Sequence, residues 1–180
     1  TKGSIAILCE KFPKETNSEI TYIQVKSASK AYSIIAGNWF DRPSENLNII
    51  GITGTNGKTT TASLLHQLFE NNLIKSGLIS TVKISIHNKN YPATHTTPDA
   101  WQIQKHLSDM VKAGCKLVFI EVSSHGLVQN RVEGIRFRGG IFTNISRDHL
   151  DYHKTLDNYV IAKKLLFDNL SSSAFALVNR

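Results

Sequence analysis

The stretch IIGITGTNGKTTTASLLHQLF, residues 49–69, constrains the fold of this chain more than any other stretch. An apolar run enters a loop of glycines, threonines and one lysine, and a pattern typical of a helix follows it. In a strand–loop–helix unit of this kind, glycines let backbone N–H groups point at phosphate oxygens, and the helix N-terminus adds a partial positive charge. The stretch therefore predicts a phosphate-binding loop at the carboxyl end of a strand.

Two side chains of this loop suit a nucleotide and its metal ion. Lys58 can reach terminal phosphates, and Thr59 can offer its hydroxyl to Mg²⁺. The usual pattern G-x-x-x-x-G-K-[ST] has a glycine where this chain has Ile52, so a glycine-rich turn that only caps a helix is the alternative. We expect phosphate binding at Gly54, Thr55, Asn56, Gly57, Lys58, Thr59 and Thr60.

Strand and helix patterns alternate after residue 47. Apolar runs predict strands at 47–53, 77–81, 116–122, 139–146 and 174–179, and helical spacing predicts helices at 60–72, 97–113 and 155–170. Residues 82–93 predict a hairpin with its turn at His87–Asn90. Thr97 is expected to cap the second helix, with Pro98 at its first position and Gly114 after its end. The alternation predicts an α/β fold: a mostly parallel sheet with helices on both faces.

The first 46 residues have shorter elements. Residues 4–9 and 20–25 are strand-like and 27–40 are helical, while DRPSEN, 41–46, is the best candidate for a linker because Pro43 has turn-forming neighbours. A chain of 180 residues is long enough for one domain plus part of another. We therefore expect part of a smaller α/β domain at 1–46 and the phosphate-binding domain at 47–180.

The composition is that of an ordinary globular protein, with 41% hydrophobic and 19% charged residues. No apolar run approaches the roughly 18 residues that a membrane helix needs. The net charge of +7 is scattered, without the interleaved aromatic and basic residues of a nucleic-acid surface. Cys9 and Cys115 form no CxxC pair, which fits a reducing cytoplasm, and Cys115 is expected to be a buried, unreactive thiol. The start lacks a signal peptide and an initiator Met, so we do not expect a natural N-terminus.

Charged residues follow two of the predicted strands. Glu121 ends one strand, so it and Thr59 should face the same crevice beyond the carboxyl ends of the sheet, where a carboxylate suits Mg²⁺. The segment FTNISRDHLDYH follows another strand and places His149 and His153 four residues apart. A zinc pair, a single histidine at a Mg²⁺ site, and turn formation by the neighbouring aspartates are the alternatives.

Lys163 occupies an apolar position of the last predicted helix. The apolar stripe of that helix passes through position 163, whereas Lys164 falls toward solvent. A buried ammonium needs a partner or a lowered pKa, and a neutral amine can react with carbon dioxide to form a carbamate, which binds metal as a carboxylate does. A snorkelling lysine with its head in water is the alternative, and the pattern alone favours it.

Five motifs together resemble the ATP-dependent Mur ligases of peptidoglycan synthesis. They are GITGTNGKTTT, HTTPD, EVSSHGLVQNR, FTNISRDHLDYH and YVIAKKLLF, in that order, over about residues 48–167. HTTPD and EVSSHGLVQNR are similar to the members that add the third peptide residue. The resemblance implies catalytic roles for Lys58, Lys163 and His149, metal binding by Thr59, Glu121, His149 and a carbamylated Lys163, and binding of a UDP-muramoyl-dipeptide by Thr96, Thr97, Ser123, Gln129 and Arg131.

The resemblance also implies a reaction. A carboxylate of the UDP-linked dipeptide attacks the γ-phosphate of ATP with Mg²⁺ present, and the amine of meso-diaminopimelate or lysine attacks the resulting acyl phosphate. Relatives of this kind have three domains, so we expect the last domain to be absent and this piece to be inactive alone. We expect a cytoplasmic enzyme that binds neither nucleic acid nor membrane; its oligomeric state stays open, with a monomer expected. Folylpolyglutamate synthetase and a nucleotide-binding module without ligase activity are the alternatives.

Overall fold

The computed structural model describes residues 3–179, so the predicted domain limits at residues 1 and 180 lie outside the described part. The strands are β1 (Ala6–Cys9), β2 (Thr21–Gln24), β3 (Asn48–Thr53), β4 (Ser76–Ile79), β5 (Lys83–Ile86), β6 (Lys89–Pro92), β7 (Leu117–Glu121), β8 (Phe137–Phe142) and β9 (Phe175–Val178). The helices are α1 (Ala28–Trp39), α2 (Lys58–Asn71), α3 (Ala100–Lys112), α4 (Ser124–Val128), α5 (Leu150–His153) and α6 (Leu156–Asp168), with a 3-10 helix, η1, at Pro43–Glu45.

The main sheet has the order β6-β5-β4-β7-β3-β8-β9. The strands from β4 to β9 in this order pair in parallel, whereas β5 and β6 form the predicted hairpin and pair antiparallel. Strand β3 lies between β7 and β8, so the loop that follows it leaves from the interior of the sheet. The predicted α/β fold with a mostly parallel sheet is confirmed.

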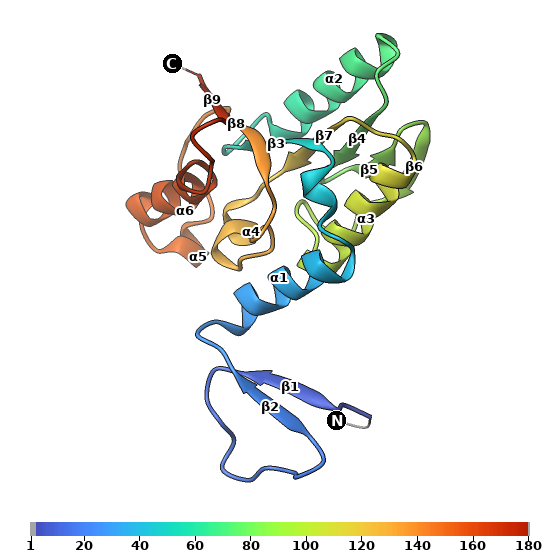
Figure 1. Ribbon diagram of the computed structural model, residues 1–180. Coiled ribbons are helices and arrows are strands. Elements are labelled where there is room, and N and C mark those ends of the chain that lie inside the picture. The colour runs from blue at the N-terminus through green and yellow to red at the C-terminus, as the bar shows by residue number, and fades with distance from the viewer. Residues whose placement is uncertain (1–2, 180) are drawn as a thin grey trace.

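Helices cover both faces of this sheet (Figure 1). Ile50 and Ile52 of β3 pack with Ala62 of α2 on one face, while Ile49 belongs to the core that α3 and α6 cover on the other face. Buried strand residues on both faces are expected for a parallel sheet covered by helices on each side. Because both faces are buried, β3 is a nearly continuous apolar run, and that run is the pattern from which the strand was predicted.

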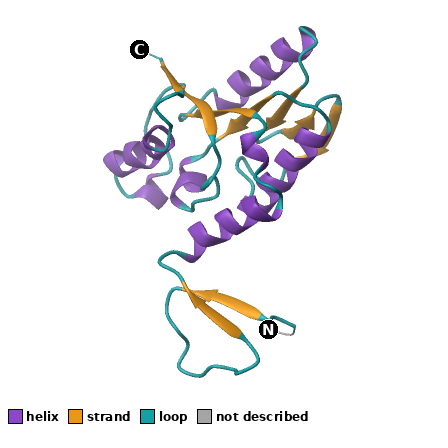
Figure 2. Ribbon diagram, in the orientation of Figure 1, coloured by secondary structure: helices purple, strands orange, loops and turns teal. Residues whose placement is uncertain are grey.

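The N-terminal residues form a separate parallel pair, β1 and β2, which lies apart from the main sheet (Figures 1 and 2). Helix α1 connects this pair to the rest and packs along α3, where Phe40 and Trp101 meet edge to face at 4.9 Å between ring centroids. The Ser33 hydroxyl also donates to the Asn130 carbonyl at 2.6 Å. The predicted linker at 41–46 contains η1, and its Pro43 is buried.

One predicted helix boundary is wrong. Helix α3 begins at Ala100 with Asp99 as its cap, because the Asp99 carboxylate accepts from the Gln102 N–H, and not with Thr97 as the cap. The Thr97 hydroxyl instead donates to the Glu121 carbonyl at 2.8 Å. A tertiary partner therefore takes the hydroxyl that local capping rules assigned to the helix. The short helices α4 and α5 were not predicted, since four or five residues carry no readable period.

Candidate functional site

The loop between β3 and α2 has backbone geometry that only glycine adopts without strain. Gly57 stands at the N-cap of α2 with φ 83° and Gly54 has φ 146°. A Cβ on Gly54 would lie 2.0 Å from the Thr143 hydroxyl oxygen, so glycine is required there for space as well. The first-turn N–H groups of α2 have no acceptor within the helix, which leaves them free to face an anion.

The segment after β8 holds this loop in place. The Thr55 N–H donates to the Asn144 carbonyl at 2.9 Å, and the Asn56 N–H donates to the Asn144 side-chain oxygen at 3.0 Å. The Asn56 carbonyl accepts from the Thr143 hydroxyl at 2.6 Å. The N–H groups of Thr55 and Asn56 and the Asn56 carbonyl therefore bond within the protein and hold the loop in this conformation. Sequence reasoning assigned no role to Thr143 and Asn144, although both lie within the motif FTNISRDHLDYH.

Lys58 folds back over the loop. Its Nζ donates to the Gly54 carbonyl at 2.9 Å and to the Thr55 carbonyl at 2.8 Å. Burial lowers the pKa of Lys58, while the carboxylates of Glu121 and Asp148 act in the opposite direction. An anion bound in the loop would give this ammonium a stronger partner than two neutral carbonyls.

Thr59 and Glu121 meet at the crevice, as the sequence predicted. The Thr59 hydroxyl donates to Glu121 Oε2 at 3.0 Å, and Glu121 is completely buried. Thr81, which follows β4, contacts both carboxylate oxygens: its N–H donates to Oε1 and its hydroxyl lies 3.0 Å from Oε2. The pairing of a hydroxyl and a carboxylate gives the hard oxygen ligands that Mg²⁺ prefers. Sequence reasoning missed Thr81 because no motif marks it.

The five predicted substrate residues gather around Thr97. Its hydroxyl oxygen accepts from the Ser123 N–H at 3.0 Å, and its carbonyl accepts from Arg131 Nη1 at 2.6 Å. Gln129 Oε1 accepts from both Nε and Nη2 of Arg131, at 2.9 and 2.6 Å. Thr96 lies on the same side, with its hydroxyl oxygen 3.1 Å from that of Thr81. The structure therefore brings these residues together around Thr97, which itself contacts the Glu121 carbonyl.

Lys163 is buried, with only 2% of its surface exposed, so the snorkelling alternative is wrong. Its Nζ donates to the Gly54 carbonyl at 2.8 Å and lies 4.4 Å from the ring centroid of Tyr159. Lys58 donates to the same carbonyl, so the two amines are neighbours. Burial and then the charge of Lys58 lower the pKa of Lys163 to about 7. Lys164 points to solvent as predicted and pairs with Asp168.

The two histidines of the motif have different surroundings. His149 has a left-handed backbone with φ 51° and a side chain that is 50% exposed, beside Asp148. His153 is buried, and its Nε2 lies 2.9 Å from the Ser124 hydroxyl. Over residues 3–179 no three His, Cys, Asp or Glu side chains converge as a metal site, so the zinc alternative has no supporting cluster.

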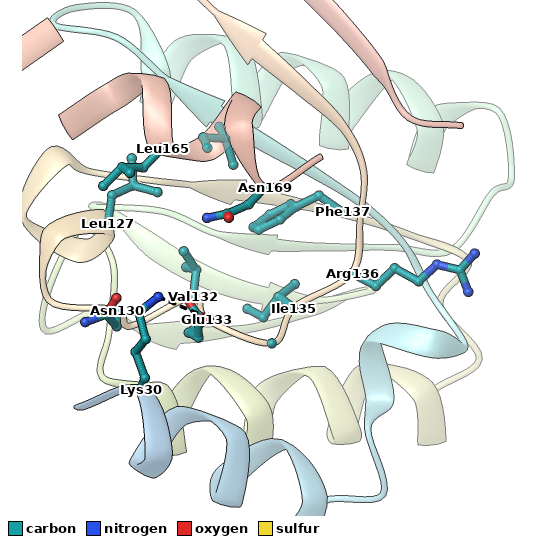
Figure 3. Close-up of a pocket in the computed structure, with 12 residues that line it drawn as sticks. Lys30, Leu127, Asn130, Val132, Glu133, Ile135, Arg136, Phe137, Leu165 and Asn169 are labelled. Atoms are coloured by element: carbon teal, nitrogen blue, oxygen red, sulfur yellow. Dashed lines mark ion pairs between the residues drawn. The ribbon is translucent and has the colours of Figure 1, made fainter. Parts of the chain in front are cut away.

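Two cavities lie near this part of the chain. One of about 450 Å³ adjoins the phosphate loop, with Gly57, Thr61, Thr143 and Asn144 among its lining residues. Another of about 380 Å³ is drawn in Figure 3 and is lined by Lys30 of α1, by the connection from α4 to β8, and by Leu165 and Asn169 at the end of α6. The second cavity opens beside the start of β8 and also reaches Leu127 and Asn130, in and just after α4.

Comparison with known proteins identifies the family. Residues 52–180 match the family model described as the Mur ligase middle domain. The chain belongs to the Mur ligase family. The family resemblance of the sequence motifs is thereby confirmed, and the phosphate loop, Glu121 and Lys163 all fall within the matched residues of this Mur ligase chain.

Named relatives agree with this assignment. The chain is 54% identical over 179 residues to the UDP-N-acetylmuramoyl-L-alanyl-D-glutamate--2,6-diaminopimelate ligase of Cytophaga hutchinsonii. It is 50% identical over 178 residues to the protein of the same name from Bacteroides thetaiotaomicron. Each alignment covers 99% of this chain, which spans only 37% of the length of these two relatives.

Solved structures share the fold. A structure of a UDP-N-acetylmuramoyl-L-alanyl-D-glutamate--2,6-diaminopimelate ligase superposes with a TM-score of 0.77 at 27% identity, covering 96% of this chain and 39% of that one. A folylpolyglutamate synthase from Mycobacterium tuberculosis, complexed with ADP, gives a TM-score of 0.69 at 19% identity, covering 86% and 42%. The latter likeness concerns the fold alone.

Within residues 3–179 of this Mur ligase chain, no helix has the length and apolar character needed to cross a membrane.

Proposed function

We propose that the full-length protein carrying this chain is an ATP-dependent ligase that adds the third amino acid to UDP-N-acetylmuramoyl-L-Ala-D-Glu. One observation carries the proposal: Glu121 joins the two halves of the site. Its carboxylate accepts from Thr59 of the phosphate loop, and its carbonyl accepts from Thr97, around which the substrate residues gather. A ligase of this kind must bring an ATP phosphate and a substrate carboxylate together. The names of the relatives favour meso-diaminopimelate over lysine as the amino acid.

The residues of the chain fit ATP and Mg²⁺. The α2 N-terminus and Lys58 would attract phosphate oxygens, and Thr59 and Glu121 would hold the metal ion together with water and phosphate. The buried Glu121 carboxylate already receives the Thr59 hydroxyl, so these two ligands need little rearrangement. Bound Mg²⁺ would supply the positive charge that offsets the repulsion between a phosphate and a carboxylate. Lys58 would stabilise the same charge from the loop side.

Lys163 and His149 complete the proposed metal-binding set. Lys163 is buried and donates to the same Gly54 carbonyl as Lys58, so a second ammonium there is unfavourable, which supports a neutral amine that takes up carbon dioxide. The resulting carbamate would bind metal as a carboxylate does. His149 has a half-exposed ring beside Asp148 and is proposed as a ligand of a second Mg²⁺.

We also propose that the protein acts in the cytoplasm on small-molecule substrates, without nucleic acid or membrane as partners. Both cysteines of the described chain are free thiols, which supports a reducing compartment. Fractionation of cells that produce the protein tests this location: recovery with the membranes would contradict it.

The deciding experiment measures phosphate release by the full-length protein. ATP, Mg²⁺ and UDP-N-acetylmuramoyl-L-Ala-D-Glu are supplied with meso-diaminopimelate, with lysine, or with no amino acid. We expect release that requires the dipeptide and is fastest with meso-diaminopimelate. Release with lysine alone would change the amino acid and keep the reaction. Release only with a folate substrate, or none with any mixture, would overturn the proposal.

A further inference from the structure

Thr81 occupies a fixed position in the turn between β4 and β5. The preceding residue, Ser80, is completely buried, and its N–H and hydroxyl both bond to the Lys83 carbonyl, at 3.1 and 2.8 Å. The Ser80 hydroxyl oxygen also accepts from the Lys83 N–H at 3.2 Å. Three hydrogen bonds in so short a turn restrict its backbone, so the direction in which Thr81 points is set by its neighbour.

The restricted turn aims Thr81 at Glu121. The Thr81 N–H donates to Oε1 at 3.0 Å, and the Thr81 hydroxyl lies 3.0 Å from Oε2. One residue therefore contacts both oxygens of a carboxylate that is completely buried. Two hydrogen bonds from one rigid turn restrict both the rotation and the tilt of that carboxylate.

The direction of each hydrogen bond follows from counting protons. An ionised carboxylate only accepts, and a hydroxyl has a single proton. Thr81 can therefore donate that proton to Glu121 Oε2 at 3.0 Å or to the Thr96 hydroxyl oxygen at 3.1 Å, and a negatively charged carboxylate is the stronger acceptor of the two. The hydroxyls of Thr59 and Thr81 thus both reach Glu121 Oε2, and the Thr81 hydroxyl also lies beside that of Thr96.

We propose that Thr81 is a positioning residue that holds the Glu121 carboxylate in the orientation needed to bind Mg²⁺ with the nucleotide. The inference rests on the proposed function, because it assumes that Glu121 serves a nucleotide-bound metal ion. Thr81 acts through Glu121 and is not itself a metal ligand. Its link to Thr96 ties that orientation to the substrate side of the crevice.

The test is Mg²⁺ binding by the complex of full-length protein with ADP, followed by isothermal titration calorimetry. Thr81→Val keeps the shape and the backbone N–H but removes the hydroxyl. Because loss of an outer-shell partner weakens metal binding about 10- to 100-fold, we expect the Mg²⁺ concentration for half-saturation to rise about tenfold or more. Binding of ADP without Mg²⁺ should stay within twofold of the parent.

Two variants control for structural damage. Thr81→Ser restores the hydroxyl and should return the half-saturation concentration to within about twofold of the parent, which a simple packing defect would not predict. Val82→Ala changes the neighbouring side chain, 69% exposed, and should have no effect. If the parent binds ADP with Mg²⁺ and Thr81→Val binds equally well, only the role of Thr81 is wrong. A parent that binds no ADP under any condition would overturn both this role and the proposed function.

Discussion

The two ends of strand β4 carry polar clusters of similar composition, but only one of them suits a ligand. At its amino end, Ser76 bonds to His66 at 2.7 Å and to Glu70 at 2.5 Å, and Glu70 bonds to His87 at 2.7 Å. Just past its carboxyl end, Thr81 bonds to Glu121 beside the phosphate loop. Both clusters combine hydroxyls with a carboxylate, so residue types alone do not separate them.

The difference lies in how α2 runs between the two ends. Its N-terminus, with Lys58 and Thr59, points into the carboxyl-end crevice and brings donors that need an anion. Its last turn brings Glu70 to the amino end, where the partial charge of the helix is unfavourable for a carboxylate. There the hydrogen bonds from Ser76 and His87 satisfy Glu70 within the protein. The amino-end cluster is therefore structural, and the carboxyl-end cluster is the one that suits a ligand.

The largest effect is expected at Lys58. Lys58→Ala in the full-length protein should lower kcat for phosphate release by about 10²-fold or more, because a preorganised charge that stabilises the phosphates is lost. Thermal stability should change little, since Lys58 bonds only to two loop carbonyls. Lys89→Ala, in an exposed part of the hairpin, is the matched control. Near-normal turnover of Lys58→Ala would break the distinction between the two ends.

Lys163 gives the next largest effect. Lys163→Ala should lower kcat about 10- to 100-fold, with partial recovery on adding short carboxylic acids, because the proposed carbamate is missing. Lys164→Ala, one residue away and exposed, should keep full activity. A fully active Lys163→Ala enzyme would remove the carbamate from the proposal.

The pH dependence of carbamate formation sharpens the same point. With the pKa of Lys163 lowered to about 7, its neutral fraction rises as the pH increases through 7, whereas an ordinary lysine stays protonated until about pH 10. At constant dissolved ¹³CO₂, an NMR carbamate signal should therefore grow between about pH 6 and pH 8. The signal should be absent in Lys163→Ala, and a signal that appears only near pH 10 would contradict the prediction.

Glu70 should affect stability and not catalysis. Glu70→Ala leaves the buried Ser76 N–H without its acceptor, so the unfolding free energy should fall by about 1–3 kcal/mol while kcat stays within twofold. Burial by itself raises the pKa of Glu70, but the hydrogen bonds from Ser76 and His87 outweigh it and lower that pKa. This contribution to stability is therefore fully present above the ordinary carboxyl pKa and is lost as the pH falls from there through the lowered pKa of Glu70 in the folded protein. Denaturant titrations over that pH range measure the unfolding free energy, and a kinetic assay measures kcat. A large fall in kcat with unchanged stability would contradict the prediction.

The smallest effect is expected at Lys164. Its pair with Asp168 is on the surface, with the lysine side chain 62% exposed, so Lys164→Ala should change the unfolding free energy by less than about 0.5 kcal/mol. Because added salt screens this exposed pair, the substitution should change the unfolding free energy by even less at high salt. A loss of several kcal/mol would mean that α6 depends on its solvent-facing side as well as on the buried side with Lys163.

Much of the fold and the phosphate loop could be predicted because their signals are local. The order of strand, glycine loop and helix around Gly57 depends on backbone conformations that neighbouring residues set. The buried runs of β3 and β7 and the spacing of α3 follow from the periods of strands and helices. The amino-acid sequence was therefore enough to predict the α/β class, the glycine loop between β3 and α2, and the charged residue at the end of β7.

Which acceptor each threonine hydroxyl bonds to depends on the tertiary structure. Thr97 was expected to cap a helix, but β7 brings the Glu121 carbonyl to its hydroxyl, and Asp99 takes the cap. Thr81 belongs to no motif and gained its contact with Glu121 only because β4 and β7 are neighbours in the sheet. Whether Lys163 is buried likewise depended on the phosphate loop that lies against it, since a helical pattern gives a face and not its surroundings. Local periods specify elements, and the choice of partners requires the contacts between residues distant in the chain.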